Sequence, residues 1–131
     1  MNEEELKRRT KQYALRAMRL ERSLPKTTEG RAIGNQLVRS ATSVGANYRA
    51  ACRSRSKAEF FAKLGTVEEE ADESAFWMEL IVEGKLVKEE LISPLLQEAN
   101  EIVLIMTSSR MSASGRDRAK SKIGNHKSKI P

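Results

Sequence analysis

The side chains of this sequence that could do chemistry are mostly arginines in its first half. On a helix that advances about 100° per residue, Arg31, Arg39, Arg49 and Arg53 fall within about 80° of one another, on the face opposite an apolar stripe. Cations gathered in this way bind phosphates without regard to sequence, because neutralising phosphates releases condensed counterions. The candidate nucleic-acid-binding residues, here called the basic stripe, are Arg31, Arg39, Arg49, Arg53, Arg55 and Lys57.

The alternative for the basic stripe is a solvated face, or one that carboxylates neutralise. Residues 6–63 carry fifteen Lys and Arg against three acids, whereas residues 64–110 carry three against eleven. Such polarity can direct either half toward an opposite charge, on a nucleic acid or on a second copy of the protein. Tyr48 lies on the apolar side of the same segment, so base stacking is not supported and any binding should favour backbone and shape.

Groups that could support catalysis are scarce. Cys52 has no histidine near it in sequence and is best interpreted as a buried, inert thiol, although its basic neighbours could lower its pKa. The acidic run at 68–73 lacks the Glu-x-x-His motifs of di-iron bundles, and the only histidine is His126; a carboxylate-only site for a hard cation stays open. No phosphate-cradling glycine loop, dinucleotide fingerprint or Ser-His-Asp set is present. The sequence predicts no enzyme, no cofactor and no metal site.

Four amphipathic helices must position these residues, over about 3–24, 28–52, 57–83 and 87–110. No segment shows the alternation of a strand, and short connections between four helices predict an all-α, antiparallel up-down-up-down four-helix bundle. The expected core positions are Leu6, Tyr13, Ala17, Leu20 and Leu24; Ile33, Leu37, Ala41, Val44, Tyr48 and Ala51; Phe60, Leu64, Val67, Ala71, Ala75, Met78 and Val82; and Leu91, Leu95, Ala99, Ile102 and Met106.

Capping residues mark the helix boundaries. Thr27 or Thr28 can cap the second helix. Ser54 or Ser56 can cap the third, with Glu59 completing a capping box after Ser56. Gly84 is expected to end the third helix by the usual preference for glycine at C-terminal ends. Pro94 should kink the fourth helix, or restart it with Ser93 as the new cap.

The length of 131 residues fits one body, which we place at residues 1–110. Residues 111–131 carry six basic groups and one acid with little apolar surface, and are expected to form a disordered basic tail. The single cysteine excludes an intramolecular disulfide, and no signal peptide or membrane span is expected. These features predict a cytoplasmic protein that does not enter a membrane.

The second half of the third helix is apolar nearly all round, which is unusual on the outside of a small monomer. Phe76, Trp77 and Leu80 point away from the core stripe. They can pack inside a wide core or form a contact between subunits, and we favour the oligomer interface because exposed apolar patches usually mark interfaces. A cyclic, head-to-tail contact would also bring basic helices against acidic ones.

Residues 36–74, QLVRSATSVGANYRAACRSRSKAEFFAKLGTVEEEADES, carry a family likeness. They resemble the central signature of the four-helix bundle proteins encoded in intervening sequences of bacterial 23S rRNA genes, and the likeness covers roughly residues 6–110. Two departures are Gly45, where many members have Pro, and Arg49 with Ala50, which stand in place of Ala and Glu. The matching positions are Arg39, Ala41, Ser43, Val44, Ala46, Asn47, Arg55, Ser56, Lys57, Glu59 and Phe60.

The resemblance implies a bacterial, non-catalytic bundle that assembles into a homopentameric ring and has suspected affinity for RNA. The fold is also similar to that of the accessory variability protein of diversity-generating retroelements, which binds a reverse transcriptase and nucleic acid. We therefore expect a non-enzymatic, ring-forming bundle that binds nucleic acid, RNA first, through the basic stripe. The alternative is a scaffold or accessory subunit that binds a protein partner such as a polymerase or reverse transcriptase.

Overall fold

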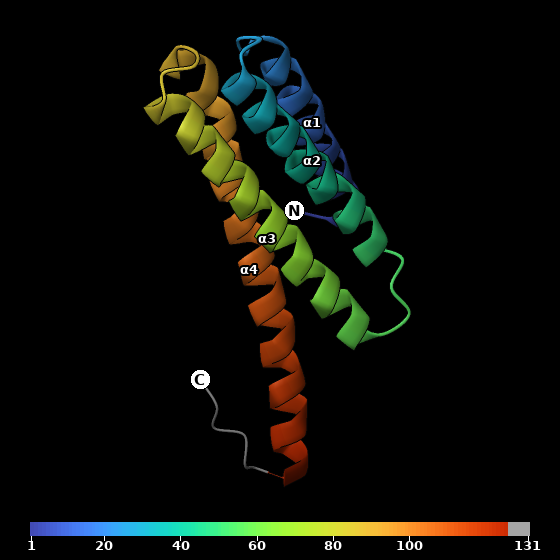
Figure 1. Ribbon diagram of the computed structural model, residues 1–131. Helices are drawn as coiled ribbons and strands as arrows, with labels where there is room; N and C mark the ends of the chain where they lie inside the picture. Colours follow the sequence, from blue (N-terminus) through green and yellow to red (C-terminus); the bar gives the residue numbers. More distant parts are fainter. Residues whose placement is uncertain (126–131) are drawn as a thin grey trace.

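The computed structural model describes the backbone of residues 1–125 and the side chains of residues 1–112. In this part the chain forms four α-helices and no strand: α1 (Glu3–Arg22), α2 (Thr28–Ala51), α3 (Lys57–Glu83) and α4 (Glu89–Asn125). Each helix packs against the next, and α4 returns to contact α1 (Figure 1). The prediction of an all-α, up-down-up-down four-helix bundle is confirmed.

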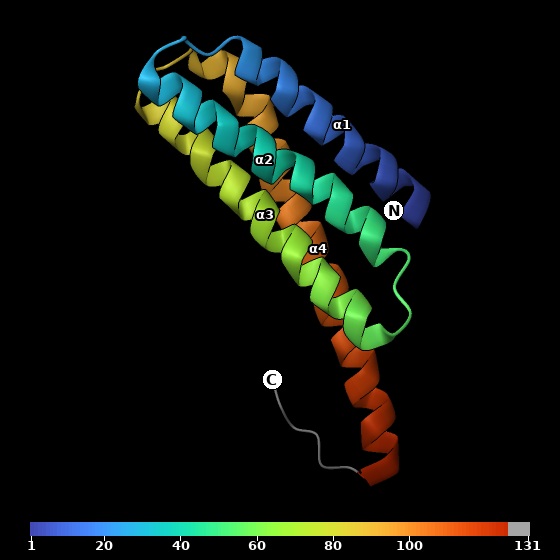
Figure 2. The same cartoon turned by 45° about the vertical axis from the view of Figure 1, so that its right-hand side comes forward.

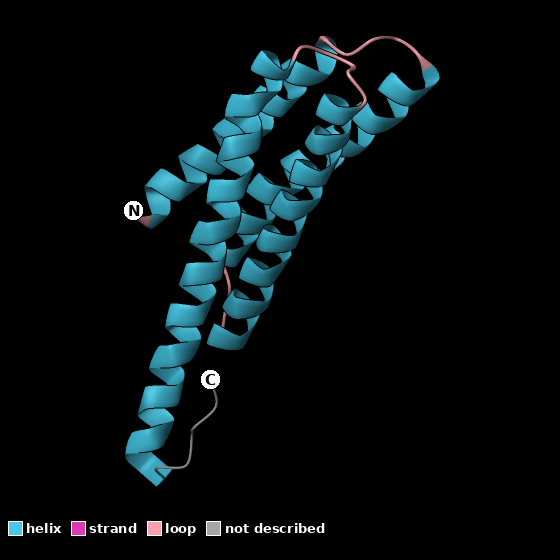
Figure 3. Cartoon of the chain, turned by 90° about the vertical axis from the view of Figure 1, so that its left-hand side faces the viewer, coloured by secondary structure: helices cyan, strands magenta, loops and turns pink. Residues whose placement is uncertain are grey.

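The helices are not packed with equal closeness. The contact between α1 and α4 is the smallest of the four, while α2 packs most extensively on α3 (Figure 2). Short loops join the helices at the two ends of the bundle, and α4 runs on past the other three (Figure 3). The open edge of the bundle is therefore the one between its first and last helices.

Side-chain caps set the starts of the first three helices. Of the two candidates for α2, Thr27 is the cap, and its Oγ1 accepts from the backbone N–H of Gly30 at 3.1 Å. For α3 the cap is Ser56, whose Oγ accepts from the N–H of Glu59 at 3.1 Å. Asn2 caps α1 in the same way. Each cap satisfies an N–H that the first helical turn leaves without a partner.

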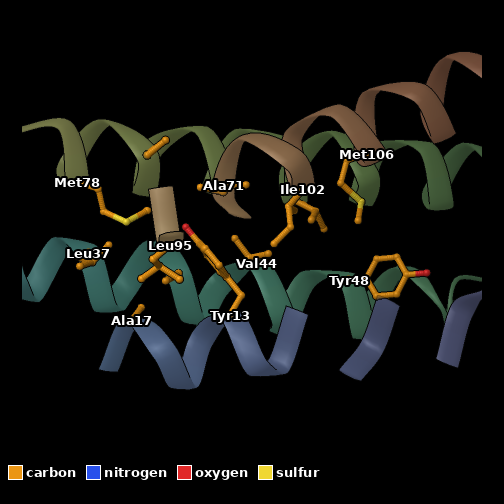
Figure 4. Close-up of a cluster of buried hydrophobic side chains, with 14 of the residues drawn as sticks. Tyr13, Ala17, Leu37, Val44, Tyr48, Ala71, Met78, Leu95, Ile102 and Met106 are labelled. Carbon is orange, nitrogen blue, oxygen red and sulfur yellow. The ribbon is translucent and has the colours of Figure 1, made fainter. Parts of the chain in front are cut away.

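The core lies along the axis between the four helices (Figure 4). Nearly all the expected core positions are buried, with two departures. Ile33, Phe60 and Val82 are only partly buried and pack against the edge of the cluster. Leu91 is 57% exposed, and its neighbour Ile92 is fully buried in its place. One residue turns a helix by about 100°, so the expected stripe on α4 was wrong by one position in its first turn.

One polar pair crosses this core. Tyr13 of α1 and Ser74 of α3 are both fully buried, and their hydroxyl groups are hydrogen-bonded. Because Ser74 donates its own proton to the carbonyl of Ala71 at 2.8 Å, Tyr13 is the donor to Ser74. Burial raises the pKa of Tyr13 to about 12, so the phenol stays protonated. The pair fixes α1 against α3 across the bundle.

Two glycines allow the backbone of α2 to approach its neighbours. A Cβ on Gly30 would lie 2.1 Å from the carbonyl oxygen of Pro25, in the turn before the helix. A Cβ on Gly45 would lie 3.3 Å from the carbonyl oxygen of Thr10, so α1 and α2 come close at this point. The small side chains of α2 therefore have a structural role in helix packing.

The third helix ends at Gly84 as expected, but the left-handed residue of its C-terminal motif is the next one. Gly84 is the C-cap but has ordinary helical angles (φ −79°), and the left-handed position falls on Lys85 (φ 56°). The N–H of Leu86 bonds to the carbonyl of Ile81, and the N–H of Lys85 to that of Val82, at 3.0 Å each. This is the pattern of a Schellman motif, with lysine where glycine is preferred.

Pro94 does not restart α4, which runs through it as one helix. Ser93 is not a cap, because its hydroxyl donates to the carbonyl of Glu89 at 3.1 Å within the same helix. Pro94 lies in the second turn and is exposed, and the helix continues through it with one backbone donor missing. The expected restart with a Ser93 cap was wrong.

The backbone of α4 also continues past Arg110 to Asn125, into the segment expected to be a disordered tail. The side chains beyond Ser112, residues 126–131 and with them His126 lie outside the described part. The domain boundary between residues 110 and 111 stays a prediction.

Candidate nucleic-acid interface

The basic stripe lies along the outer side of α2 and in the loop and first turn that follow. All six of its side chains are exposed. With a rise of about 1.5 Å per residue, Arg31 and Arg49 are about 27 Å apart along the helix axis. The stripe is therefore a long surface, and its members can have different ion-pair partners.

Arg39 is ion-paired with the helix beside it. Its Nη1 lies 3.3 Å from Glu70 Oε1, and its Nη2 contacts Glu73 Oε2, both on α3. The contact with Glu73 raises the pKa of the guanidinium further above its ordinary value. For this residue the pairing with the acidic run takes place inside one subunit, and the charge of Arg39 is already compensated.

Four other members of the stripe are in a different situation. Among the described side chains, no carboxylate forms an ion pair with Arg31, Arg49, Arg53 or Arg55. Lys57 is exposed at the first position of α3 and takes part in an interaction of its own. The structure thus divides the stripe into a compensated arginine near its middle and uncompensated ones at both ends.

A basic groove of about 500 Å³ lies between α1 and α2. Its cationic side chains are Lys7, Arg8 and Lys11 of α1, Arg49 of α2, and Arg53 of the turn that follows α2. The sequence predicted Arg49 and Arg53, but the three cations of α1 were missed. The spacing of Arg8 and Lys11 places them as neighbours on one helix face, which the sequence shows. That this face lies beside Arg49 depends on how α1 packs against α2.

The floor of the basic groove is made of small residues. The short side chains in its lining are those of Ala14 of α1 and of Thr42 and Ala46 of α2, beside Gly45. The hydroxyl of Thr42 donates to the carbonyl of Val38 at 2.7 Å, which occupies the only proton it has to give. Small side chains let the two backbones approach, and the long cationic side chains stand on either side of the contact.

The expected interface residues lie on α3. Phe76 is 50% exposed and packs edge-on against Trp77, with ring centroids 5.1 Å apart. The indole Nε1–H of Trp77 donates to Glu73 Oε2 at 3.0 Å, and Trp77 and Leu80 are both half-buried. Of the three side chains, Phe76 offers the most apolar surface to a partner.

Glu73 links this aromatic pair to the basic stripe, since it accepts from Trp77 and from Arg39 together. The hydrogen bond from Trp77 is the main cause that lowers the pKa of Glu73 below its ordinary value, and Arg39 adds to it. The carboxylate is therefore ionised at neutral pH, when both of its partners can donate.

Another arginine connects the first and last helices across the open edge of the bundle. Arg9 of α1 makes a bidentate pair with Glu98 of α4, at 2.6 and 2.8 Å, and reaches Glu101 at 2.7 Å. On the opposite side, Arg110 of α4 pairs with Glu68 of α3 at 2.9 Å. Several carboxylates of the acidic half are thus engaged inside the chain, where they bind one helix to another.

The remaining candidate groups show no sign of catalytic chemistry. Cys52 is half-buried, and burial raises the pKa of its thiol, so the nucleophilic thiolate is disfavoured. The described side chains contain no group of three or more His, Cys, Asp or Glu that could hold a metal ion. Within the described residues, none of the helices is both long and apolar enough to span a bilayer.

Comparison with known proteins identifies the family. Residues 2–108 match the family described as 23S rRNA-intervening sequence protein. The chain belongs to this family. It is similar to the crystal structure of a protein with unknown function from the S23 ribosomal protein family of Bacteroides thetaiotaomicron VPI-5482. The TM-score is 0.75 and the identity 28%, over 80% of this chain and 97% of that one. A search among curated proteins found no match.

Proposed function

We propose that this member of the 23S rRNA-intervening sequence family is a non-enzymatic cytoplasmic protein that binds nucleic acid, with RNA as the first candidate. The observation that carries the proposal is the exposure of Arg31, Arg49, Arg53 and Arg55 without carboxylate partners among the described side chains. Such cations lose no ion pair when a phosphate replaces water beside them, and each contact releases counterions. The family's description, which names 23S rRNA, supports RNA over DNA.

Arg39 modifies the proposal. Phosphate contact by Arg39 would first have to break its pairs with Glu70 and Glu73, so its net contribution to binding is smaller than that of its neighbours. The nucleic-acid interface is thus the surface at the C-terminal end of α2, around Arg49 and Arg53, with Arg55 and Lys57 beside it. Arg31 is a separate contact at the other end of the helix.

The test is the salt dependence of binding to a structured RNA, followed by fluorescence anisotropy between 50 and 200 mM salt. Each phosphate contact contributes roughly 0.7–0.9 to the slope of log affinity against log salt. The double variant Arg49→Gln/Arg53→Gln should lower the slope by about 1.4–1.8. The control variant Arg39→Gln should change it little. Failure of the unchanged protein to bind RNA at 50 mM salt, with its assembly intact, would exclude this function.

We further infer a ring-shaped homo-oligomer, of five subunits as the family resemblance implies, with Phe76, Trp77 and Leu80 at the subunit contact. The half-exposed Phe76 supports this, because a large aromatic side chain is stabilised when a partner covers it. Light scattering on the unchanged protein and on Phe76→Ser measures the mass directly. A monomeric mass for the unchanged protein would refute the ring.

The second candidate function is a scaffold or accessory subunit for a protein such as a polymerase or reverse transcriptase. The same exposed Phe76 favours it, since the aromatic pair could equally bind a different protein. In this case Phe76→Ser would leave the mass of the particle unchanged. RNA binding would then be absent or insensitive to the Arg49→Gln/Arg53→Gln change.

A further inference from the structure

The basic groove between α1 and α2 holds more positive charge than the chain itself neutralises. Lys7 is partly compensated, since its Nζ lies 3.2 Å from Glu4 and 3.8 Å from Glu3. Arg8, Lys11, Arg49 and Arg53 have no ion pair among the described side chains. Four uncompensated cations therefore face one groove, two from α1, one from α2 and one from the turn that follows α2.

We propose that this groove binds the phosphodiester backbone of the nucleic acid. Arg8 and Lys11 of α1 then contribute as much to the binding affinity as Arg49 and Arg53. The inference rests on the proposed function and narrows it, because it moves the centre of binding from the face of one helix to the seam between two. It also adds two residues outside the basic stripe.

The floor of the groove determines what it can recognise. It consists of small side chains, and its one hydroxyl group, that of Thr42, already donates to the carbonyl of Val38. The side-chain floor therefore offers no donor for a base edge, and there is no aromatic ring in the lining for a base to stack on. Without a donor in the floor or a ring for stacking, the groove favours contact with the phosphodiester backbone by its cations over recognition of particular bases.

The close packing of α1 on α2 keeps the cations at a fixed spacing. The approach of 3.3 Å between a Cβ at Gly45 and the carbonyl of Thr10 shows that the backbones nearly touch below the groove. The spacing along the axis of α1 is about 4.5 Å from Arg8 to Lys11. Arg53 lies in the turn directly after α2, four residues beyond Arg49. Four charges over so short a length repel one another, and a polyanion relieves this repulsion better than a single carboxylate.

A second copy of the chain is the competing occupant, since its α3 is acidic. Part of that acidic face is already used: Glu68, Glu70 and Glu73 pair with Arg110 and Arg39 inside the chain. Five other carboxylates of α3 have no ion pair among the described side chains, but the groove lining contains no apolar side chain larger than alanine to pack against a helix. The lack of apolar packing surface therefore favours a nucleic-acid backbone over a second subunit in this groove.

The test compares two charge-matched double variants of α1 in the full chain. Arg8→Gln/Lys11→Gln removes two groove cations, and Arg19→Gln/Arg22→Gln removes two exposed cations of the same helix that do not line the groove. Binding of a structured RNA at 50 and 200 mM salt is measured for both, with helicity and thermal unfolding as checks of folding. Because no described side chain depends on Arg8 or Lys11 for an ion pair, the groove variant should fold normally.

We expect the groove variant to lose about 1.4–1.8 from the salt slope, which makes its affinity 7- to 12-fold less sensitive to the change from 50 to 200 mM. The control should lose much less. Equal losses for the two variants would overturn the groove while leaving nucleic-acid binding in place. A fall in particle mass for the groove variant alone would show that a second copy occupies the groove. No binding by the unchanged protein would remove the proposed function and this site with it.

Discussion

The cluster of Arg9, Glu98 and Glu101 offers a test of what holds the open edge of the bundle together. Arg9→Ala removes a guanidinium that donates three hydrogen bonds to two carboxylates of α4. The side chains of Arg9 and Glu98 are 22% and 15% exposed, so the pair lies between a surface ion pair and a buried one. The contact between α1 and α4 is also the smallest in the bundle.

The expected cost follows from these exposures. Exposed ion pairs are worth about 0–1 kcal/mol, whereas removing one partner of a buried pair costs about 3–5 kcal/mol. Arg9→Ala should therefore destabilise the protein by about 2 kcal/mol, partly because Glu98 and Glu101 are left side by side. At roughly 3–5 °C per kcal/mol for a chain of this size, Tm should fall by about 6–10 °C.

The assay is urea unfolding followed by circular dichroism, with Lys7→Ala as the control. Lys7 lies on the same helix and also pairs with two glutamates, but its partners are 56% and 73% exposed. The control should therefore change the free energy of unfolding by less than about 0.5 kcal/mol. A double-mutant cycle with Glu98→Gln should return a coupling energy of about 1–2 kcal/mol. An Arg9→Ala cost equal to that of the control would refute the reasoning.

Three further predictions concern single residues. The pKa of Glu73 is lowered, so its bond to Trp77 stabilises the fold above the ordinary carboxyl pKa of 4.5 and is lost as pH falls through the lowered value. Fluorescence of the single tryptophan should report this step, and Glu73→Gln should abolish it while helicity is unchanged. Lys85→Gly should stabilise the protein by about 0.5–1 kcal/mol in urea unfolding, because Lys85 has a φ of 56°, whereas Lys85→Ala should give no gain. Gly30→Ala should cost about 2–3 kcal/mol, since its Cβ would lie 2.1 Å from a backbone carbonyl oxygen. The control is Gly65→Ala, whose Cβ would meet only one side-chain atom at 4.0 Å and which should stabilise the helix in the same assay.

Features that depend on local pattern could be predicted from the sequence. Helical spacing identified the four helices, most of the core and the caps at Thr27 and Ser56, because burial and capping follow from neighbours along the chain. Leu91 was misplaced because Pro94 and a single turn give little pattern from which to fix a face. Lys85 in the left-handed position was not foreseeable, since the neighbouring glycine carries the usual signal.

Features that depend on how helices pack could not be predicted in this way. Arg39 and Arg49 look equivalent in the sequence, as members of one helical face. The packing of α3 gives Arg39 two carboxylates, and the packing of α1 gives Arg49 a groove shared with Arg8. Half of the candidate site could therefore be predicted from the sequence, namely its residues at the end of α2. The cations of α1 could not, because they join the site through the packing of two helices, which periodicity alone does not describe.

The separation of charge along the chain bears on whether subunit contact and nucleic-acid binding compete. Of the eleven acids in residues 64–110, five are ion-paired with a described side chain, and the other six have no ion pair among the side chains that the structure describes. Of the fifteen cations in residues 6–63, Lys7, Arg9 and Arg39 are ion-paired; with Lys57 set aside as well, eleven have no ion pair among the described side chains. A head-to-tail contact that used all six acids would still leave cations uncompensated. Assembly into a ring and binding of a polyanion therefore do not have to draw on the same arginines, and the groove variants and the Phe76 variant should affect separate measurements.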